Sequence, residues 1–237
     1  MRFTKERLEK ILNDHAQWIE DHDTGIRADL SYTDLSSFDL SQTNLSRAKL
    51  LGTNLIGANL TRAKLVDADM TDANLSRANM TGANLTRADL IISNLTGANL
   101  SGANLTRAIL ARANLTRAIL IRSNLSQANL IRADLSFADL SFATLSGARL
   151  YRADLSDANL TGADMFGADL TFASMLHSNM SHARLSFANL SNAMLTHANL
   201  SSSNLSDANL TGADTIDTDF TNVDISRAIW TNGRKYT

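Results

Sequence analysis

The chain has no cysteine, which excludes disulfides and thiol chemistry. No apolar run approaches the roughly 20 residues that a membrane span needs. The N-terminal residues lack the apolar segment of a secretory signal, so we expect a cytoplasmic protein that does not enter the membrane. The formal net charge of −2 gives no bulk attraction for nucleic acid or an anionic membrane, and we expect no direct nucleic-acid binding.

Motifs of common active sites are also absent. The sequence contains no Gly-x-Gly-x-x-Gly, Walker, His-Glu-x-x-His or Cys-x-x-Cys motif. Serine and threonine are abundant, but none of them stands in a nucleophile-and-base arrangement. The sequence therefore predicts a protein without catalytic activity and without a cofactor.

What the sequence does contain is a period of five. From Leu30 to Trp230 almost every fifth residue is Leu or a large apolar substitute, and the residue two positions earlier is in most cases Ala. A period of five fits neither a helix nor a strand. Units this short cannot bury a face alone, so they must stack into a solenoid with one continuous core. The Leu and Ala side chains should fill this core, which would leave no pocket for a substrate.

The other three positions of each unit are expected to face solvent. Nine of the eleven glycines lie two residues after the Leu, which indicates a turn with positive φ. Arginine is common at the same position, so turns of mixed type are expected. Outward Asn residues recur just before the Leu and predict amide ladders along the solenoid.

Several units resemble a known motif. Ala83–Arg87, Ala98–Gly102 and Ala158–Gly162 are similar to the A(D/N)LXX motif of pentapeptide repeat proteins, and the resemblance covers residues 26–230. It implies an all-β fold, a right-handed quadrilateral parallel β-helix in which residue n stacks on residue n+20. The 26–230 region would then form about ten coils and a rod of about 50 Å, at ~4.8 Å per coil. The biochemically studied members of this family resemble DNA and inhibit or protect DNA gyrase.

Both ends of such a rod need a cover. Residues 1–25 predict a capping helix over about residues 4–22, with Thr4 as its N-cap and Gly25 as its stop. Residues 231–237 form a polar tail. Phe220, Ile225 and Trp230 occupy the last core positions, where either the tail folds back over Trp230 or two rods meet end to end. We favour the second alternative, a weak C-terminal homodimer.

One side of the predicted rod departs from the polar outward pattern. Exposed apolar residues rimmed by Arg and Tyr are typical of a protein-interaction site. The alternative is neutral variation, because β-branched residues suit an extended backbone anywhere. The candidate partner-binding residues are Ile91, Ile92, Ile109, Arg112, Ile131, Arg132, Arg149, Tyr151 and Arg152.

A second column combines imidazoles and carboxylates. Asp157, His177, His197 and Asp217 stack on successive coils, where they either bind a metal such as zinc or form a hydrated polar column. Among the aromatic residues, Phe137 should stack on Arg117 and Phe142 on Arg122. Phe166 should lie beside Phe187, whereas Phe172 should stand alone.

Charge density separates the functional hypotheses. DNA carries one charge per ~1.7 Å, so a DNA mimic of about 50 Å needs roughly 30 negative charges. The most acidic side carries far fewer: Asp34, Asp134, Asp154, Asp157, Asp214 and Asp217, with Arg77 and Arg117. The sequence therefore favours a non-catalytic scaffold that presents an outer face to another protein. The alternative is a DNA-mimicking modulator of DNA gyrase, and phosphate binding by the Arg column is a third hypothesis.

Overall fold

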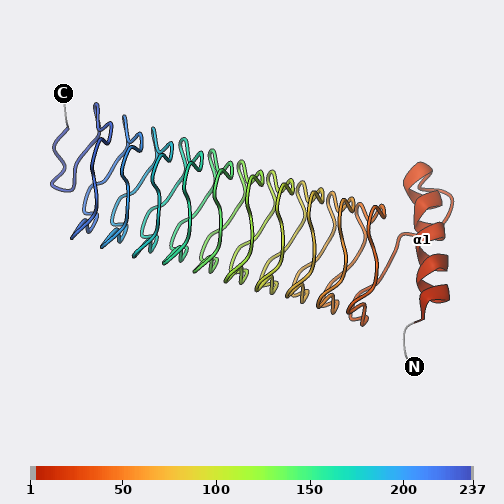
Figure 1. Ribbon diagram of the computed structural model, residues 1–237. Helices are drawn as coiled ribbons and strands as arrows, with labels where there is room; N and C mark the ends of the chain where they lie inside the picture. Colours follow the sequence, from red (N-terminus) through yellow and green to blue (C-terminus); the bar gives the residue numbers. More distant parts are fainter. Residues whose placement is uncertain (1–3, 236–237) are drawn as a thin grey trace.

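The computed structural model describes residues 4–235 of the chain. Figure 1 shows a rod of stacked coils with one helix, α1 (Lys5–Glu20), lying across one end. Residues 231–235 of the tail lie at the opposite end of the rod. No helix among the described residues is long and apolar enough to cross a membrane.

The coils are joined by single-residue parallel β-bridges rather than by long strands. A bridge occurs at every fifth residue, from Asp29↔Lys49 to Asn209↔Ile229. Each bridge joins residue n to residue n+20, so four pentapeptides make one coil, as predicted. Residues of equal register therefore form columns along the rod, and the four sides of the rod can be described by these columns.

The core follows the predicted register. Ala98 and Leu100 are fully buried, and Asn99 between them is half-buried on the outside. Serine replaces the inward Ala at a few positions, and most of these hydroxyls donate to a carbonyl of the same turn, whereas the buried Ser203 hydroxyl has no partner in the described structure. Ser93 and Ser123, for example, donate to the carbonyls of Leu90 and Leu120, each at 2.7 Å. The interior is thus a continuous stack of Leu-type and Ala-type side chains.

All turns of the rod share one conformation, so the expectation of mixed turn types was wrong. The second residue after the Leu has positive φ at every unit from Tyr32 to Arg227, whether or not it is glycine. In the unit of Leu110, the Ala113 N–H donates to the Leu110 carbonyl at 3.0 Å, and Arg112 has φ 58°. An i→i+3 hydrogen bond with positive φ at the third residue is typical of a type II turn.

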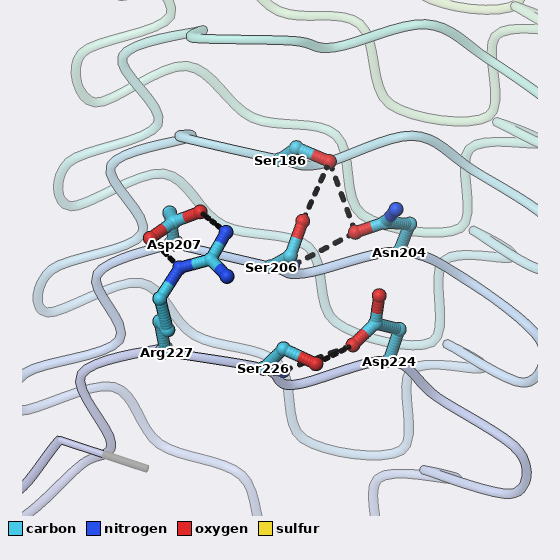
Figure 2. Close-up of polar contacts among 7 residues, drawn as sticks. All are labelled: Ser186, Asn204, Ser206, Asp207, Asp224, Ser226 and Arg227. Atoms are coloured by element: carbon cyan, nitrogen blue, oxygen red, sulfur yellow. Dashed lines mark hydrogen bonds and ion pairs between the residues drawn. The ribbon is translucent and has the colours of Figure 1, made fainter. Parts of the chain in front are cut away.

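The residue before each Leu caps the turn that follows it. Asn99 Oδ1, for example, accepts hydrogen bonds from the Ser101 N–H at 3.0 Å and from the Ser101 hydroxyl at 2.7 Å. Figure 2 shows this cap at Asp224 with Ser226, and it shows Asn204 Oδ1 accepting also from Ser186 of the preceding coil.

The predicted amide ladders were therefore wrong. No Asn side chain bonds another Asn side chain among residues 4–235. Where an Asn side chain bonds the stacked residue of the preceding coil, the acceptor is Asp, as from Asn59 Nδ2 to Asp39 Oδ1 at 2.9 Å. In units such as that of Asn99, the Asn oxygen already accepts from both the N–H and the hydroxyl of its own turn, and this leaves no lone pair for the amide of the next coil.

Helix α1 caps the first coil. Thr4 is its N-cap, as predicted, and accepts from the Arg7 N–H at 3.3 Å. The helix buries Leu8 and His15 against the rod and ends at Glu20, slightly before the predicted end. Gly25 is not the helix cap. A Cβ there would lie 2.2 Å from the Asp14 carbonyl oxygen, so glycine lets the chain pass tightly against the helix before the first coil.

At the other end, the tail folds back on one side of the last coil. Lys235 forms an antiparallel bridge with Ile229, and the Trp230 N–H donates to the Arg234 carbonyl at 2.8 Å. Phe220, Ile225 and Trp230 pack half-buried against the core, as their positions predicted. On the other three sides of this coil, the N–H groups that in earlier coils donate to the following coil have no acceptor within the described part of the chain. Those of Thr215, Phe220 and Ile225 are among them.

Candidate protein-interaction face

One corner of the rod carries the predicted partner-binding residues. Ile92, Arg112, Arg132, Arg152 and Phe172 hold the same turn position on five successive coils, and all five side chains are exposed. We call this column, together with the residues beside it, the arginine patch. The other members are Ile91, Ile109, Ile131, Arg149 and Tyr151. Of these, Arg149 is exposed and the others are half-buried.

The three stacked arginines of the patch have no carboxylate partner among residues 4–235. Elsewhere on the rod, two arginines at the same turn position pair with an aspartate of the preceding coil, whereas isolated arginines such as Arg62 and Arg77 have no carboxylate partner in the described structure. Arg87 makes a bidentate contact with Asp67, with both distances 2.7 Å, and Arg227 makes one with Asp207. Three like charges at coil spacing repel one another. The arginine column therefore does not contribute to the stability of the rod as the paired arginines do.

Nearby carboxylates are occupied by the backbone. Asp89 accepts from the Ile91 N–H at 3.0 Å, and Asp169 accepts from both the N–H and the hydroxyl of Thr171. Asp169 follows Arg149 in its column, yet the two make no ion pair in the described structure. The guanidinium groups of the patch thus remain available to an external anion.

Ile92 is held in an unfavourable backbone conformation. Its φ is 53°, and it is the one β-branched residue among all the turn positions from Tyr32 to Arg227. β-Branched residues are rare in the left-handed region because the branched side chain crowds the backbone. The side chain is 48% exposed, so packing against the core does not compensate for this strain. Strain at an exposed apolar residue points to a role outside the fold.

An aromatic group closes the other end of the column. The Arg152 guanidinium lies 5.3 Å from the Tyr151 ring centre and 5.6 Å from that of Phe172. The two rings meet edge to face at 6.0 Å. The expectation that Phe172 stands alone was wrong. The stacking rule places residue 172 directly after residue 152, and this signal was already present in the sequence.

The His column is brought together but does not form a ligand set. His177 and His197 stack with nearly parallel rings, 4.9 Å between centres and 11° apart. His197 Nδ1 lies 3.7 Å from Asp217 Oδ2. Among residues 4–235 no three His, Cys, Asp or Glu side chains, Asp157 included, converge as a metal site would require. Stacked rings point their nitrogens sideways, which suits a hydrated polar column.

The other aromatic contacts agree with the predicted stacking. Arg117 lies over Phe137 at 5.7 Å and Arg122 over Phe142 at 6.0 Å. Phe166 and Phe187 are 5.4 Å apart. Because each of these rings already contacts a neighbour in the chain, local surface packing accounts for them.

Replacing Ile92 by Gly is expected to stabilise the protein by about 1 kcal/mol. The substitution removes left-handed strain of about 1–2 kcal/mol, partly offset by the greater freedom of glycine in the unfolded chain. Urea unfolding followed by circular dichroism measures the change. Arg112→Gly, at the same position one coil further on, should gain less because arginine is not β-branched. A destabilised Ile92→Gly variant would show that the side chain serves the fold.

The family model for pentapeptide repeats matches in 8 copies, over residues 26–62, 53–90, 93–130, 133–171, 163–201 and 203–229. The chain belongs to the pentapeptide repeat family. The right-handed quadrilateral β-helix expected from the motif is thereby confirmed, and the protein is a pentapeptide repeat scaffold.

Solved structures of the family are similar to this protein. HetL from the cyanobacterium Nostoc sp. strain PCC 7120 is 34% identical over 89% of this chain and 92% of its own, with a TM-score of 0.54. A pentapeptide repeat protein of the Arabidopsis thaliana thylakoid lumen is 35% identical over 41% of this chain and 68% of its own, with a TM-score of 0.39. No protein of curated function matches the chain in sequence.

Proposed function

We propose that this pentapeptide repeat protein is a non-catalytic scaffold that binds another protein through the arginine patch. The observation that carries the proposal is the unpaired column of Arg112, Arg132 and Arg152 on three successive coils. These charges repel one another along the rod, and a partner that brings negative charge removes the repulsion. The strained, exposed Ile92 at one end of the column adds an apolar contact of the kind found in interfaces.

The similarity to HetL supports a role in regulation rather than in chemistry. HetL is described as involved in the regulation of heterocyst differentiation. By this similarity we propose that the scaffold contributes a binding surface to a regulatory complex.

Capture of partners from a native lysate tests the proposal. Arg112, Arg132 and Arg152 are changed to Gln together, since Gln42 and Gln127 already occupy this turn position in the chain. We expect the variant to lose a protein that the wild type retains. The matched control changes Arg62, Arg77 and Arg122 to Gln, at the same turn position on other sides. Equal capture by all three proteins would contradict the proposal.

A gyrase supercoiling assay addresses the alternative function. The acidic side of the rod carries too few carboxylates to imitate DNA, so we expect no effect of the protein on supercoiling. If the arginine triple variant still inhibits or protects gyrase, the function would be assigned to the acidic side of the rod and not to the arginine patch.

We also propose a weak end-to-end homodimer through the last described coil. The N–H groups of Thr215, Phe220 and Ile225 offer an edge to which a second rod can add. The end is small, so the interface should lie near or below the ~1,200 Å² of a standard one. Sedimentation of the wild type and Trp230→Asp at increasing concentration is the measurement. A wild type that stays monomeric throughout would mean that the folded-back tail closes this end.

A further inference from the structure

We infer that the arginine patch binds an acidic α-helix of the partner, laid along the axis of the rod. This inference rests on the proposed function and specifies the chemistry of the partner. Along the corner column the side chains follow in the order Ile92, Arg112, Arg132, Arg152 and Phe172, one per coil. Three cations are thus bracketed by two exposed apolar side chains, and the partner should present the complementary order.

The charge of the three arginines favours carboxylates at the partner positions that lie opposite them. The guanidinium groups of Arg112 and Arg132 have no ion-pair partner in residues 4–235. Arg87 shows what such a group binds on this rod, because it holds both oxygens of Asp67 at 2.7 Å. A partner carboxylate placed over each arginine reproduces that bidentate contact.

Spacing selects a helix over a strand. At ~4.8 Å per coil, Arg112 and Arg152 are about 10 Å apart, and Ile92 and Phe172 are about 19 Å apart. A helix rises about 1.5 Å per residue, so acidic residues at i+4, i+7 and i+11 span about 10 Å on one face. Apolar residues at i and i+14 of that face are about 21 Å apart. In an extended strand, three successive residues of one face span about 14 Å, which overshoots the arginines.

The surroundings of the column disfavour a nucleic acid. Asp72 precedes Ile92 in the same column, and Asp89 and Asp169 lie in the column of Arg149. A polyanion longer than the three arginines would be brought against these carboxylates. The apolar ends, Ile92 and Phe172, offer nothing to a phosphate backbone, whereas they match the apolar residues of an amphipathic helix.

Synthetic helical peptides of about 20 residues test the inference. The patterned peptide carries Leu at i and i+14 and Glu at i+4, i+7 and i+11 on an Ala/Gln background. A scrambled peptide has the same composition with the Glu residues distributed around the helix. A third peptide has the same charges but contains prolines, so that it stays extended. Fluorescence anisotropy measures the binding of each peptide, and of a DNA duplex, to the full-length protein.

We expect the patterned helix to bind at least tenfold more tightly than either control peptide. The triple change of Arg112, Arg132 and Arg152 to Gln should remove this preference, and the triple change of Arg62, Arg77 and Arg122 should leave it intact. Equal binding of the three peptides, or tighter binding of the DNA duplex, would overturn the inference. Loss of the lysate partner in the same arginine variant would then still support the proposed function, so the two failures are distinguishable.

Discussion

Replacing Leu100 by Ala is expected to lower the free energy of unfolding by about 2–5 kcal/mol, toward the upper end of that range. The side chain is fully buried in the middle of the rod, between the equivalent side chains of the preceding and following coils. Its backbone is fixed on both sides. The Leu100 N–H donates to the Ile119 carbonyl at 2.7 Å, and the Asn99 N–H donates to the Ala78 carbonyl at 2.9 Å. The cavity therefore cannot close by movement of the coil.

Ile225→Ala provides the comparison. Ile225 occupies the same inward position in the last described coil, but it is only half-buried. Its truncation should cost about 1 kcal/mol, because part of the side chain is already in contact with water. Urea unfolding of both variants, followed by circular dichroism, measures the difference. Equal losses would mean that packing does not depend on position along the rod, contrary to a solenoid in which each coil is supported by its neighbours.

The sequence predicted the register and the core because the same two positions carry apolar residues in nearly every five-residue unit. Leu100 and Ala98 are inward for the same reason as their counterparts in the other units, so chance substitutions such as Met80 do not obscure the pattern. The column rule also placed Arg112, Arg132 and Arg152 together. Columns depend only on the coil length, which is fixed when four units close one turn of the rod.

The glycines predicted positive φ in their own units, but the same conformation in the units without glycine was not predictable from residue type. Arginine has no preference for positive φ, yet Arg112 adopts it because its N–H must reach the Ile131 carbonyl of the next coil, at 3.0 Å. Hydrogen bonds between coils thus impose the left-handed conformation on residue types that do not intrinsically favour it. The same reasoning explains the Asn ladders. Residue type suggested amide stacking, but the local backbone N–H competes successfully for the Asn oxygen.

The folding back of the tail was also left open by the sequence. Lys235 pairs with Ile229 after a tight turn at Gly233, whose φ is 77°. The Asn232–Gly233 dipeptide marks such a turn, but it does not specify which surface the tail then contacts. That choice depends on the exposed edge of the last coil, a property of the assembled rod.

Lowering the pH from about 6.5 is expected to release helix α1 from the rod, because His15 is buried in its neutral form. His15 is fully buried, its Nδ1 accepts from the Ala28 N–H at 3.1 Å, and its Nε2 has no hydrogen-bond partner in the described structure. Burial lowers the pKa of His15 below its ordinary value, and the positive charge of Arg27 acts in the same direction. The backbone of Ser46 acts in the opposite direction.

The direction of the pH dependence of helix docking follows from proton binding. Between the ordinary pKa of about 6.5 and the lowered pKa of the docked state, the undocked helix binds a proton that the docked helix does not. Docking therefore has its full stability above about pH 6.5 and loses up to about 1.4 kcal/mol for each pH unit below it, until the pH reaches the lowered pKa of His15. A protonated Nδ1 can no longer accept a hydrogen bond. The Ala28 N–H, at the start of the first coil, then loses its acceptor.

Hydrogen exchange of the α1 amides measures this release, after correction for the intrinsic pH dependence of exchange. Protection of Leu8 and its neighbours should fall by up to about tenfold per pH unit below 6.5, while amides near Leu100 stay protected. His15→Gln should abolish this dependence, because a Gln amide oxygen can accept from the Ala28 N–H but does not titrate. His182→Gln, at an exposed turn far from the helix, should retain it. Exchange of α1 that is independent of pH in the wild type would show that the helix is held without regard to the charge of His15.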